Sequence, residues 1–507
     1  MTRFALIALA LSLNPTEAAR ADSVAREVVE LDATAQLALM ADGKRSSHDL
    51  VVEYLSRINA LDRGGPKLNA VIELNPDALK LAQARDRERA EGRCGVLCGL
   101  PILIKDNIDV AGPMATSAGS LALSDHHARK NAPLVERLLA AGVVILGKTN
   151  LSEWANFRSS QSSSGWSSRG GQTRNPHVLD RSPCGSSSGS GAAMAARLSA
   201  ATIGTETDGS IICPAAINGV VGMKPTVGWI AQAGIIPISS SQDSAGPITA
   251  SVRDARLLLG VMAARKELVA LANSAALRGK RFGIARQAMG FNAAVDAEFA
   301  QAVQLLRQAG AEVIDVEIPN YGKYRDAEFL LLKYEFKAGL NEYLSRTDAR
   351  VAVKSLSDLI AFNQRNQARV MPWFGQETLL AANALGDLNS VKYLTASRSA
   401  KALAGAKGAL KSLRDKRLDA LIAPSNAPAW RIDWVNGDNY SGGDASIAAV
   451  PGYPAITVPM GFLHQLPLGI SFIGGPNSDA ALLQLAESFE QLKPARRMPT
   501  YRASIEQ

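Results

Sequence analysis

The chain has 507 residues, of which 47% are hydrophobic and 20% are charged. This composition is typical of a globular protein with a sizeable core, and it excludes bulk disorder. The formal net charge is +8, but the lysines and arginines are scattered and no nucleic-acid motif is present. We therefore read the charge as a solvated basic surface and expect no nucleic-acid partner.

Residues 1–21 have the pattern of a secretory signal peptide. Arg3 supplies a positive start, Phe4–Leu13 is apolar, and Ala19-Arg20-Ala21 is a small-x-small cleavage site. A membrane anchor needs about 20 apolar residues, so this stretch is too short to span a bilayer, and no other segment is long enough. The alternative, a buried N-terminal helix of a cytoplasmic enzyme, is disfavoured by Pro15. We expect an exported, periplasmic protein with no integral membrane segment.

The rest of the chain predicts alternating helices and strands. Apolar residues have helical spacing over Val24–Leu61, Asp77–Glu91, Ala132–Ala141 and Ala297–Ala309. Short apolar runs predict strands, which in chain order are Leu100–Lys105, Gly142–Gly147, Phe282–Ala285, Glu312–Val316, Ala420–Ile422, Ile456–Val458 and Leu468–Phe472. This alternation predicts an α/β fold in which helices cover both faces of a sheet. Residues 325–415 are helical in pattern, so we expect one domain over 22–507 with a helical insertion there.

The four cysteines are too few for a disulfide framework at this length. Cys94 and Cys98 share a Gly-rich loop, where a disulfide and two free thiols are equally compatible with the pattern. Cys184 and Cys213 flank two serine-rich clusters, and we expect them to be small buried residues that support those clusters. No histidine lies near Cys184 or Cys213 in the sequence, so a cysteine nucleophile is not expected, and no zinc-site spacing is present.

Two Ser/Gly clusters, Cys184–Gly191 and Thr205–Ser210, are the strongest chemical signal. Ser210 ends a Gly-containing turn in which successive backbone N–H groups can converge on one point and bind an oxyanion. Lys105 directly follows the apolar run Pro101–Ile104, where burial would lower the pKa of a lysine from about 10.4 towards 7 to 8 and make it a general base. A serine nucleophile with a lysine base requires no histidine.

These clusters resemble the amidase signature family of Ser-Ser-Lys hydrolases. Further motifs follow in the order of the family, namely Lys105-Asp106-Asn107, Gly147-Lys148-Thr149-Asn150, Gly222–Thr226, Ser244–Pro247 and Gly452–Pro459. The resemblance covers nearly all of the chain after its first few dozen residues and is weaker over 265–410. It implies a central mixed β-sheet between helical layers.

The resemblance also implies a role for each matching residue. Ser210 is the nucleophile, Ser186 is the relay that follows a cis peptide bond, and Lys105 is the base. The backbone amides that bind the oxyanion are those of Thr207, Asp208, Gly209 and Ser210. Two alternatives remain. Ser186 could be the N-cap of the Ala-rich helix that follows, a role that Ser187 or Ser188 could equally fill. Lys148 is a competing lysine. We expect Lys148 to have a structural role, because it follows its strand at a Gly turn.

Within the family, three segments resemble bacterial peptide amidases, namely Asn150–Phe157, Ser182–Cys184 and Thr205–Gly209. This likeness implies removal of the C-terminal carboxamide of peptides, with release of ammonia, no cofactor, no metal and no obligate protein partner. An aryl acylamidase or a general aliphatic amidase is the alternative.

Three aromatic residues are candidates for the substrate pocket. Trp154, Phe157 and Trp166 lie in loops between the strand that ends at Gly147 and the Ser186 cluster. We expect at least one of their rings to line the pocket, although any one of them can also pack in the core.

The sequence departs from the family pattern at two places. Cys184 and Ser188 stand where the family has glycines around the relay serine, and Ile211-Ile212 stands where Ile-Arg is usual. The missing arginine leaves the triad intact but removes a charge, so charged ligands known for the family are not transferred to this chain.

The serine-rich clusters fit three other patterns less well. Gly185–Gly189 matches the G-x-S-x-G elbow of α/β-hydrolases, with Ser187 as nucleophile and His464 as base. That elbow needs a strand directly before it, and Val178–Pro183 is polar and broken by proline. A phosphate-binding module would need a P-loop or a G-x-G-x-x-G motif, and the chain has neither. An amidotransferase subunit of the same family would work in the cytoplasm with partner chains, which the export signal disfavours.

Overall fold

The computed structural model of the chain describes residues 30–270, 277–443 and 445–505. The signal-peptide pattern over 1–21 lies outside these residues. Within the described ranges, no helix combines the length and apolar character that a membrane crossing requires.

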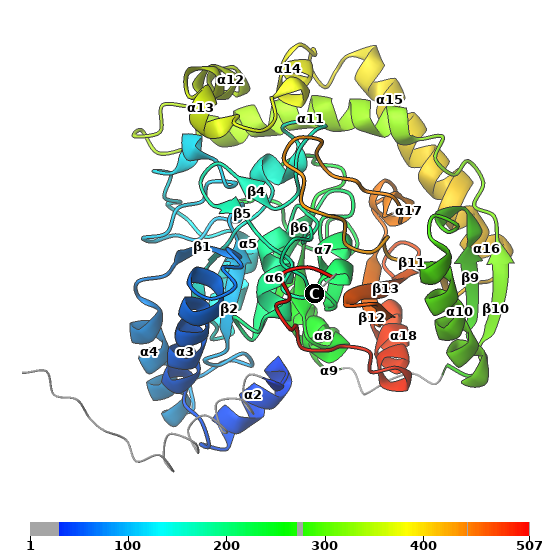
Figure 1. The fold of residues 1–507 in the computed structure, drawn as a ribbon, viewed down its shortest axis with the longest axis horizontal. Coiled ribbons are helices and arrows are strands. Elements are labelled where there is room, and N and C mark those ends of the chain that lie inside the picture. The colour runs from blue at the N-terminus through cyan, green and yellow to red at the C-terminus, as the bar shows by residue number, and fades with distance from the viewer. Residues whose placement is uncertain (1–29, 271–276, 444, 506–507) are drawn as a thin grey trace, which may run out of the picture.

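An 11-stranded mixed sheet runs through the middle of the molecule (Figure 1). In spatial order its strands are β1 (Val71–Leu74), β3 (Val144–Thr149), β2 (Pro101–Lys105), β6 (Ala201–Glu206), β8 (Ser244–Thr249), β7 (Val221–Lys224), β12 (Ala455–Leu463), β13 (Leu466–Ile473), β11 (Ala420–Pro424), β9 (Arg281–Ala285) and β10 (Glu312–Val316). Strand β2 runs parallel to β3 and β6, and β9 runs parallel to β10 and β11. The other neighbours are antiparallel. A separate hairpin joins β4 (Trp166–Ser167) to β5 (Gly171–Gln172).

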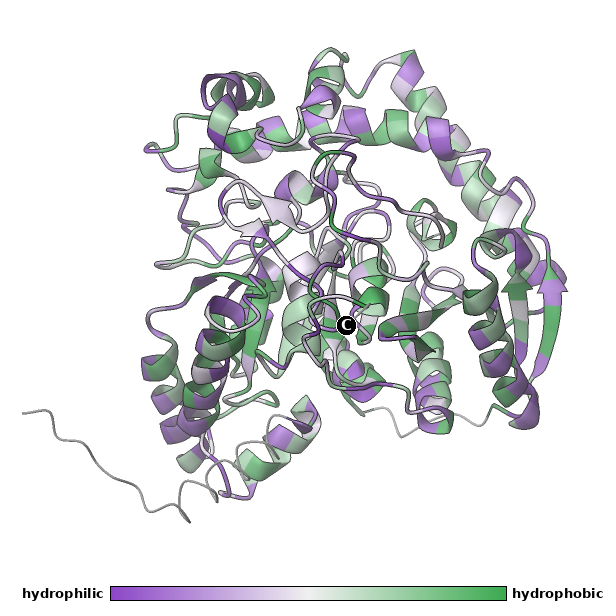
Figure 2. Cartoon of the chain, viewed as in Figure 1, coloured by the Kyte–Doolittle hydropathy of each residue, from purple (hydrophilic) through white to green (hydrophobic). Residues whose placement is uncertain are grey.

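Helices cover both faces of this sheet. They include α4 (Ala78–Ala90), α5 (Pro133–Ala140), α6 (Ser188–Ala195), α7 (Ile212–Ile217), α8 (Val252–Met262), α10 (Ala293–Gln308) and α18 (Asp479–Leu492). Successive residues of β11 enter different clusters: Ile422 packs in the largest core cluster with Phe299 of α10, whereas Leu421 packs with Ile212 of α7. Figure 2 shows the outer helices with mixed hydropathy and β2 with apolar residues. The predicted α/β fold with a helix-covered mixed sheet is confirmed.

Most predicted elements match observed ones to within a few residues, with two corrections. The expected helix Val24–Leu61 is divided, in its described part, into α2 (Ala33–Ala41), α3 (Ser47–Arg57) and the π-helix η1 (Ile58–Arg63). The division occurs because Ser46 starts α3 with a capping box to Asp49. Lys148 does not follow its strand at a turn, since β3 continues through Thr149.

The residues between 325 and 415 form helices, as their pattern predicts. The long helix α11 (Arg325–Ser345) crosses the top of the molecule in Figure 1, followed by α12 (Leu356–Arg365), α13 (Gln367–Val370), α14 (Glu377–Asn383), α15 (Val391–Lys401), the π-helix η5 (Ala402–Ala409) and α16 (Leu410–Asp415). Phe336 and Leu340 of α11 pack with Trp154 and Phe157, which follow β3. The helical segment therefore covers the loops that lead to the serine cluster.

Candidate active site

Lys105 lies where the carboxyl ends of two parallel strands meet. It is the last residue of β2, and its neighbour β6 ends beside it at Glu206. The Nζ atom donates hydrogen bonds to Ser186 Oγ at 2.8 Å, Ser187 Oγ at 3.0 Å and Thr205 Oγ1 at 2.8 Å. It also approaches the Thr205 carbonyl at 3.3 Å.

Burial makes this lysine unusually easy to deprotonate. Its side chain is fully enclosed, at 0% exposure. Desolvation lowers the pKa of Lys105 from 10.5 to about 7, although the negative charges of Asp243 and Glu206 oppose that shift. No carboxylate of the described chain lies within ion-pair distance of Nζ. A neutral amine is therefore accessible near neutral pH, as a general base requires.

Ser186 and Ser187 reach the lysine from the start of α6. The peptide bond between Gly185 and Ser186 is cis. Ser187 is the N-cap residue of α6 but forms no side-chain cap. Its hydroxyl donates to the Thr205 carbonyl at 3.0 Å and accepts from the Thr205 amide at 3.2 Å and from Lys105. The N-cap position considered for Ser186 is therefore occupied by Ser187, whose hydroxyl is already hydrogen-bonded to Thr205 of β6.

Ser210 lies in a turn that is joined to this serine loop. The Ser187 amide donates to the Ser210 carbonyl at 3.2 Å. Ser210 is 8% exposed, whereas Ser186 is completely buried. Of the two serines, Ser210 is therefore the one that keeps some contact with solvent.

The turn around Ser210 has free backbone donors. Gly209 adopts a φ of +80°, a left-handed conformation that glycine adopts at little cost. The amides of Ile211 and Ile212 both donate to Glu206 Oε2, at 2.7 and 2.9 Å. In contrast, the amides of Gly209 and Ser210 donate to no other group of the described chain. A developing negative charge at this turn would meet donors that no protein group already uses.

All four cysteines are paired, which corrects one prediction and settles an open question. Cys94 and Cys98 form a disulfide with a Cα–Cα distance of 5.5 Å. Cys184 and Cys213 are buried as expected, but they are not free thiols, because they form a second disulfide with a Cα–Cα distance of 6.0 Å. The two cysteines are 29 residues apart in the sequence, so their proximity could not be predicted locally. It arises only when both serine turns fold onto β6.

The three aromatic candidates for the substrate pocket are buried. Trp154 is 2%, Phe157 7% and Trp166 6% exposed. Phe157 packs on Phe336, with ring centroids 4.8 Å apart, and Trp166 packs edge-on against Phe374. Burial favours a packing role for these rings, and their contact with substrate stays a prediction.

The elbow that would make Ser187 a nucleophile is not built in the described chain. No strand directly precedes Ser187, and its hydroxyl is buried within the contacts to Lys105 and Thr205. His464, the candidate base, lies exposed at the turn between β12 and β13. A histidine-activated Ser187 therefore has no structural basis.

Three polar residues at the site were missed by the sequence analysis. Thr205 Oγ1 accepts hydrogen bonds from Lys105 and, at 3.0 Å, from Asn107 Nδ2. Thr207 Oγ1 donates to the buried Asp243 carboxylate at 2.5 Å. Burial raises the pKa of Asp243 to about 6. Asn107 lay in a quoted motif, and Asp243 directly precedes another, so motif position was the only available signal.

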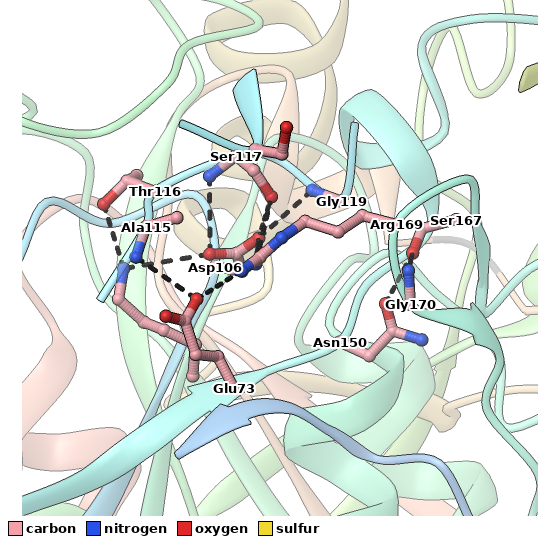
Figure 3. Close-up of polar contacts among 12 residues, drawn as sticks. Glu73, Asp106, Ala115, Thr116, Ser117, Gly119, Asn150, Ser167, Arg169 and Gly170 are labelled. Carbon is pink, nitrogen blue, oxygen red and sulfur yellow. Dashed lines mark hydrogen bonds and ion pairs between the residues drawn. The ribbon is translucent and has the colours of Figure 1, made fainter. Parts of the chain in front are cut away.

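A buried ionic network lies behind the lysine, on Asp106. Ser117 and Gly119 donate to its carboxylate, and Arg169 approaches it at 3.4 Å while also binding Glu73 (Figure 3). Lys148 Nζ is 4.0 Å from Asp106 Oδ1. Desolvation raises the pKa of Asp106, against the attraction of Lys148 and Arg169. The network fixes the chain directly after Lys105.

Comparisons with known proteins show which family the chain resembles. The Amidase family model matches residues 49–483. A probable amidase of Arabidopsis thaliana is 39% identical over 483 residues, covering 90% of this chain and 88% of the relative. A glutamyl-tRNA(Gln) amidotransferase subunit of Pseudomonas aeruginosa is 34% identical over 484 residues, covering 89% of this chain and 95% of the relative.

A solved structure is more similar still. The native peptide amidase from Stenotrophomonas maltophilia superposes with a TM-score of 0.86 at 49% identity, covering 93% of this chain and 99% of that chain. The fold, the family match and the relatives together show that this chain belongs to the amidase signature family and is a hydrolase of amide carbon–nitrogen bonds.

Proposed function

We propose that this amide hydrolase works through Ser210 as nucleophile, Ser186 as proton relay and Lys105 as base. Neutral Lys105 accepts the proton of Ser186 as Ser186 accepts that of Ser210, and Ser210 Oγ bonds to the amide carbon. The same relay then protonates the leaving nitrogen, the carbon–nitrogen bond breaks, and an acyl-enzyme remains. Water deprotonated through the relay releases the acid and restores Ser210.

The observation that carries this proposal is the hydrogen bond of 2.8 Å between Lys105 Nζ and Ser186 Oγ in a fully buried setting. A lysine at the surface would hold its proton to about pH 10 and could not serve as a base near neutrality. Here desolvation brings the pKa to about 7. Hydrogen-bond contact and a matched pKa are the two properties expected of a general base.

For the oxyanion we propose the turn Thr207–Ser210. The unengaged amides of Gly209 and Ser210 support this assignment. Thr207, through its hydroxyl bond to Asp243, anchors the start of the turn. Preorganised donors of this kind are each worth about 100- to 1,000-fold in rate.

Alanine variants test the triad. Ser210→Ala should abolish turnover without unfolding the protein, because one hydroxyl is removed from a preformed site. Ser186→Ala should be similarly impaired, and the double variant should be little worse than either single variant, since the residues act as a unit. A serine-directed phosphonate should label Ser210. Substantial activity in Ser210→Ala, together with loss in Ser187→Ala, would contradict the assignment.

As substrate we propose the C-terminal carboxamide of peptides. The support is the 49% identity to a peptide amidase over nearly the whole of both chains. Ammonia release from peptide amides, measured beside acyl anilides and aliphatic amides, separates this substrate class from the alternatives. Mass spectrometry should show conversion of the terminal amide to the acid with no shorter fragments. Internal cleavage products would exclude a peptide amidase while leaving the triad mechanism in place.

We also propose that the protein is exported to the periplasm. The signal-like pattern over 1–21 motivates this proposal, and the two disulfides support it, because disulfides persist mainly in oxidising compartments. Expression in a bacterium with a periplasm, followed by fractionation and N-terminal sequencing, should find a mature chain that starts at Asp22. An unprocessed cytoplasmic protein would contradict export.

A further inference from the structure

The Cys184–Cys213 disulfide joins the two turns that carry the proposed catalytic serines. Cys184 lies two positions before Ser186, and Cys213 lies three positions after Ser210, inside α7. The bond therefore closes a covalent ring that contains both serines and the strand β6 between them. The second disulfide, Cys94–Cys98, lies in the loop before β2 and contains no proposed catalytic residue.

The backbone at Cys184 gives a reason to connect this bond with function. Cys184 has a φ of +56°, a left-handed conformation that is disfavoured for any residue with a Cβ atom. The amidase signature resemblance leads one to expect glycine in this region. This chain instead places a larger side chain there and bonds it to the turn of the other serine.

The disulfide is buried in an apolar cluster. Both half-cystines are buried, at 5% and 4% exposure. They pack in one apolar cluster whose other buried members are Val178, Ile217, Ala429, Trp430 and Leu466. The cluster also packs the disulfide against the segment around Trp430, whose carbonyl accepts a hydrogen bond of 2.7 Å from the Ser182 amide.

Hydrogen bonds join the same two segments on either side of the disulfide. Besides the bond from the Ser187 amide to the Ser210 carbonyl, Asn218 Nδ2 donates to the Pro183 carbonyl at 2.9 Å and to the Pro214 carbonyl at 2.8 Å. The first two of these contacts join the segments non-covalently, and the third lies within the segment that follows Ser210. The disulfide adds a covalent link between the two turns.

We infer that the Cys184–Cys213 disulfide is a positioning element of the reaction, which fixes the turn of Ser210 relative to the loop of Ser186. This inference rests on the catalytic roles proposed above. Proton transfer requires heavy atoms within hydrogen-bond reach, and a misplacement of about 1 Å can cost about 100-fold in rate. Loss of the disulfide should therefore lower kcat more than it raises KM, because the serines lose their mutual placement while the substrate-binding surface remains.

Two variants remove the bond in different ways. Cys184→Gly also relieves the left-handed backbone, and Cys213→Ala leaves the Cys184 side of the loop unchanged. We expect kcat and the rate of phosphonate labelling at Ser210 to fall about tenfold or more in both, with a small change in KM. The matched control is Cys94→Ser/Cys98→Ser, which should keep both rates. Assays are run at a temperature where circular dichroism shows every variant to be folded.

The outcomes separate this inference from the proposed function. Unchanged kcat and labelling in Cys184→Gly and Cys213→Ala, beside an inactive Ser210→Ala, overturn the positioning role and leave the triad intact. An active Ser210→Ala instead overturns the triad itself. If either cysteine variant does not fold, the unaltered enzyme is partly reduced in sub-denaturing urea, and each disulfide is quantified by alkylation and mass spectrometry. Activity must then fall in proportion to the fraction of molecules in which the Cys184–Cys213 bond is intact. Activity that survives loss of this bond refutes the inference.

Discussion

Lys105 and Lys148 are two buried lysines on neighbouring parallel strands that have different surroundings. In the register of β2 and β3, Lys105 pairs with Thr149, and Lys148 pairs with Ile104. Paired residues share a face of a sheet and successive residues alternate, so the two lysines point to opposite faces. Lys105 meets hydroxyl groups, whereas Lys148 lies near the Asp106 carboxylate and donates to the Ile108 carbonyl at 2.6 Å.

Burial alone does not make a lysine a general base. Desolvation lowers the pKa of both lysines. At Lys148 the shift is opposed by the attraction of Asp106, whose Oδ1 lies 4.0 Å from Nζ, and by that of Asp109 and Glu73. A neighbouring carboxylate favours the protonated form of a buried lysine, whereas a neutral hydroxyl adds no charge that does so. We therefore propose proton transfer for Lys105 and a structural role for Lys148.

The largest expected effect is that of Lys105→Met on turnover. The substitution keeps the length of the side chain and removes the amine, so activity should fall about 100- to 10,000-fold, as for loss of a general base. The midpoint temperature of thermal unfolding should change little or even increase, because a desolvated polar group is removed. Steady-state ammonia release and circular dichroism measure the two quantities. Activity close to that of the unaltered enzyme would end the assignment of Lys105 as base.

Lys148→Met should affect stability instead of chemistry. Without Lys148, Arg169 is the one charged partner of the buried Asp106 carboxylate that remains among the described residues. Breaking a buried pair typically costs about 3–5 kcal/mol of unfolding free energy. Urea unfolding should report this loss, while kcat per folded molecule, determined by phosphonate titration of active sites, stays near that of the unaltered chain. An equal loss of kcat in the two lysine variants would remove the distinction between them.

The pH dependence sharpens the role of Lys105. Only the neutral amine accepts a proton, and the pKa of Lys105 is about 7. Activity should therefore rise with pH through about 7 and fall about tenfold for each pH unit below it. The same fall of activity below pH 7, the acid limb of the pH profile, should persist in His464→Ala, because that histidine is exposed and remote from the proposed triad. Loss of the limb in this variant would point to a histidine base.

The smallest effect is expected for Asp243→Asn. The Asp243 charge raises the pKa of Lys105, so its removal should move the acid limb to lower pH, by less than about one unit. The asparagine carbonyl can still accept the hydrogen bonds that the Ile238 and Ser239 amides donate at this position. The maximal rate should then change little. A limb that moves to higher pH would mean that Asp243 does not act on Lys105 by its charge.

The sequence predicted the parts of the fold whose strands are rich in large apolar residues. It missed β1, β6, β7 and β8, three of which lie at the centre of the sheet. Strands β6 and β8 consist mainly of small residues, because the serine loop and neighbouring backbone pack closely against them. A Cβ atom at Gly204 would lie 2.8 Å from Ser187 Oγ, and one at Gly246 would lie 2.0 Å from the Met223 carbonyl oxygen. Close backbone packing leaves no hydrophobic pattern to detect.

The candidate site likewise contains residues that sequence motifs identify and contacts that only the tertiary structure reveals. Lys105, Ser186 and Ser210 stand in motifs that can be recognised along the chain, and the structure brings their segments together. The Cys184–Cys213 bond and the contact of Thr207 with Asp243 depend on tertiary distances, which residue types do not encode. Phe157 appeared free to line a pocket because nothing in its own loop indicates that Phe336 of α11 packs on it.

The order of strands in the sheet also has a consequence for how the chain folds. The sheet is continuous only because β7 pairs with β12, where Lys224 lies opposite Ala455. During translation, the strand that carries Lys105 is therefore synthesised long before the C-terminal strands that complete the sheet. Contacts between such distant segments slow folding and leave the apolar edge of the first strands exposed until they form. Folding of this enzyme should be post-translational and sensitive to chaperones, and substitutions at the β7–β12 junction should reduce the yield of folded protein more than the activity of the molecules that fold.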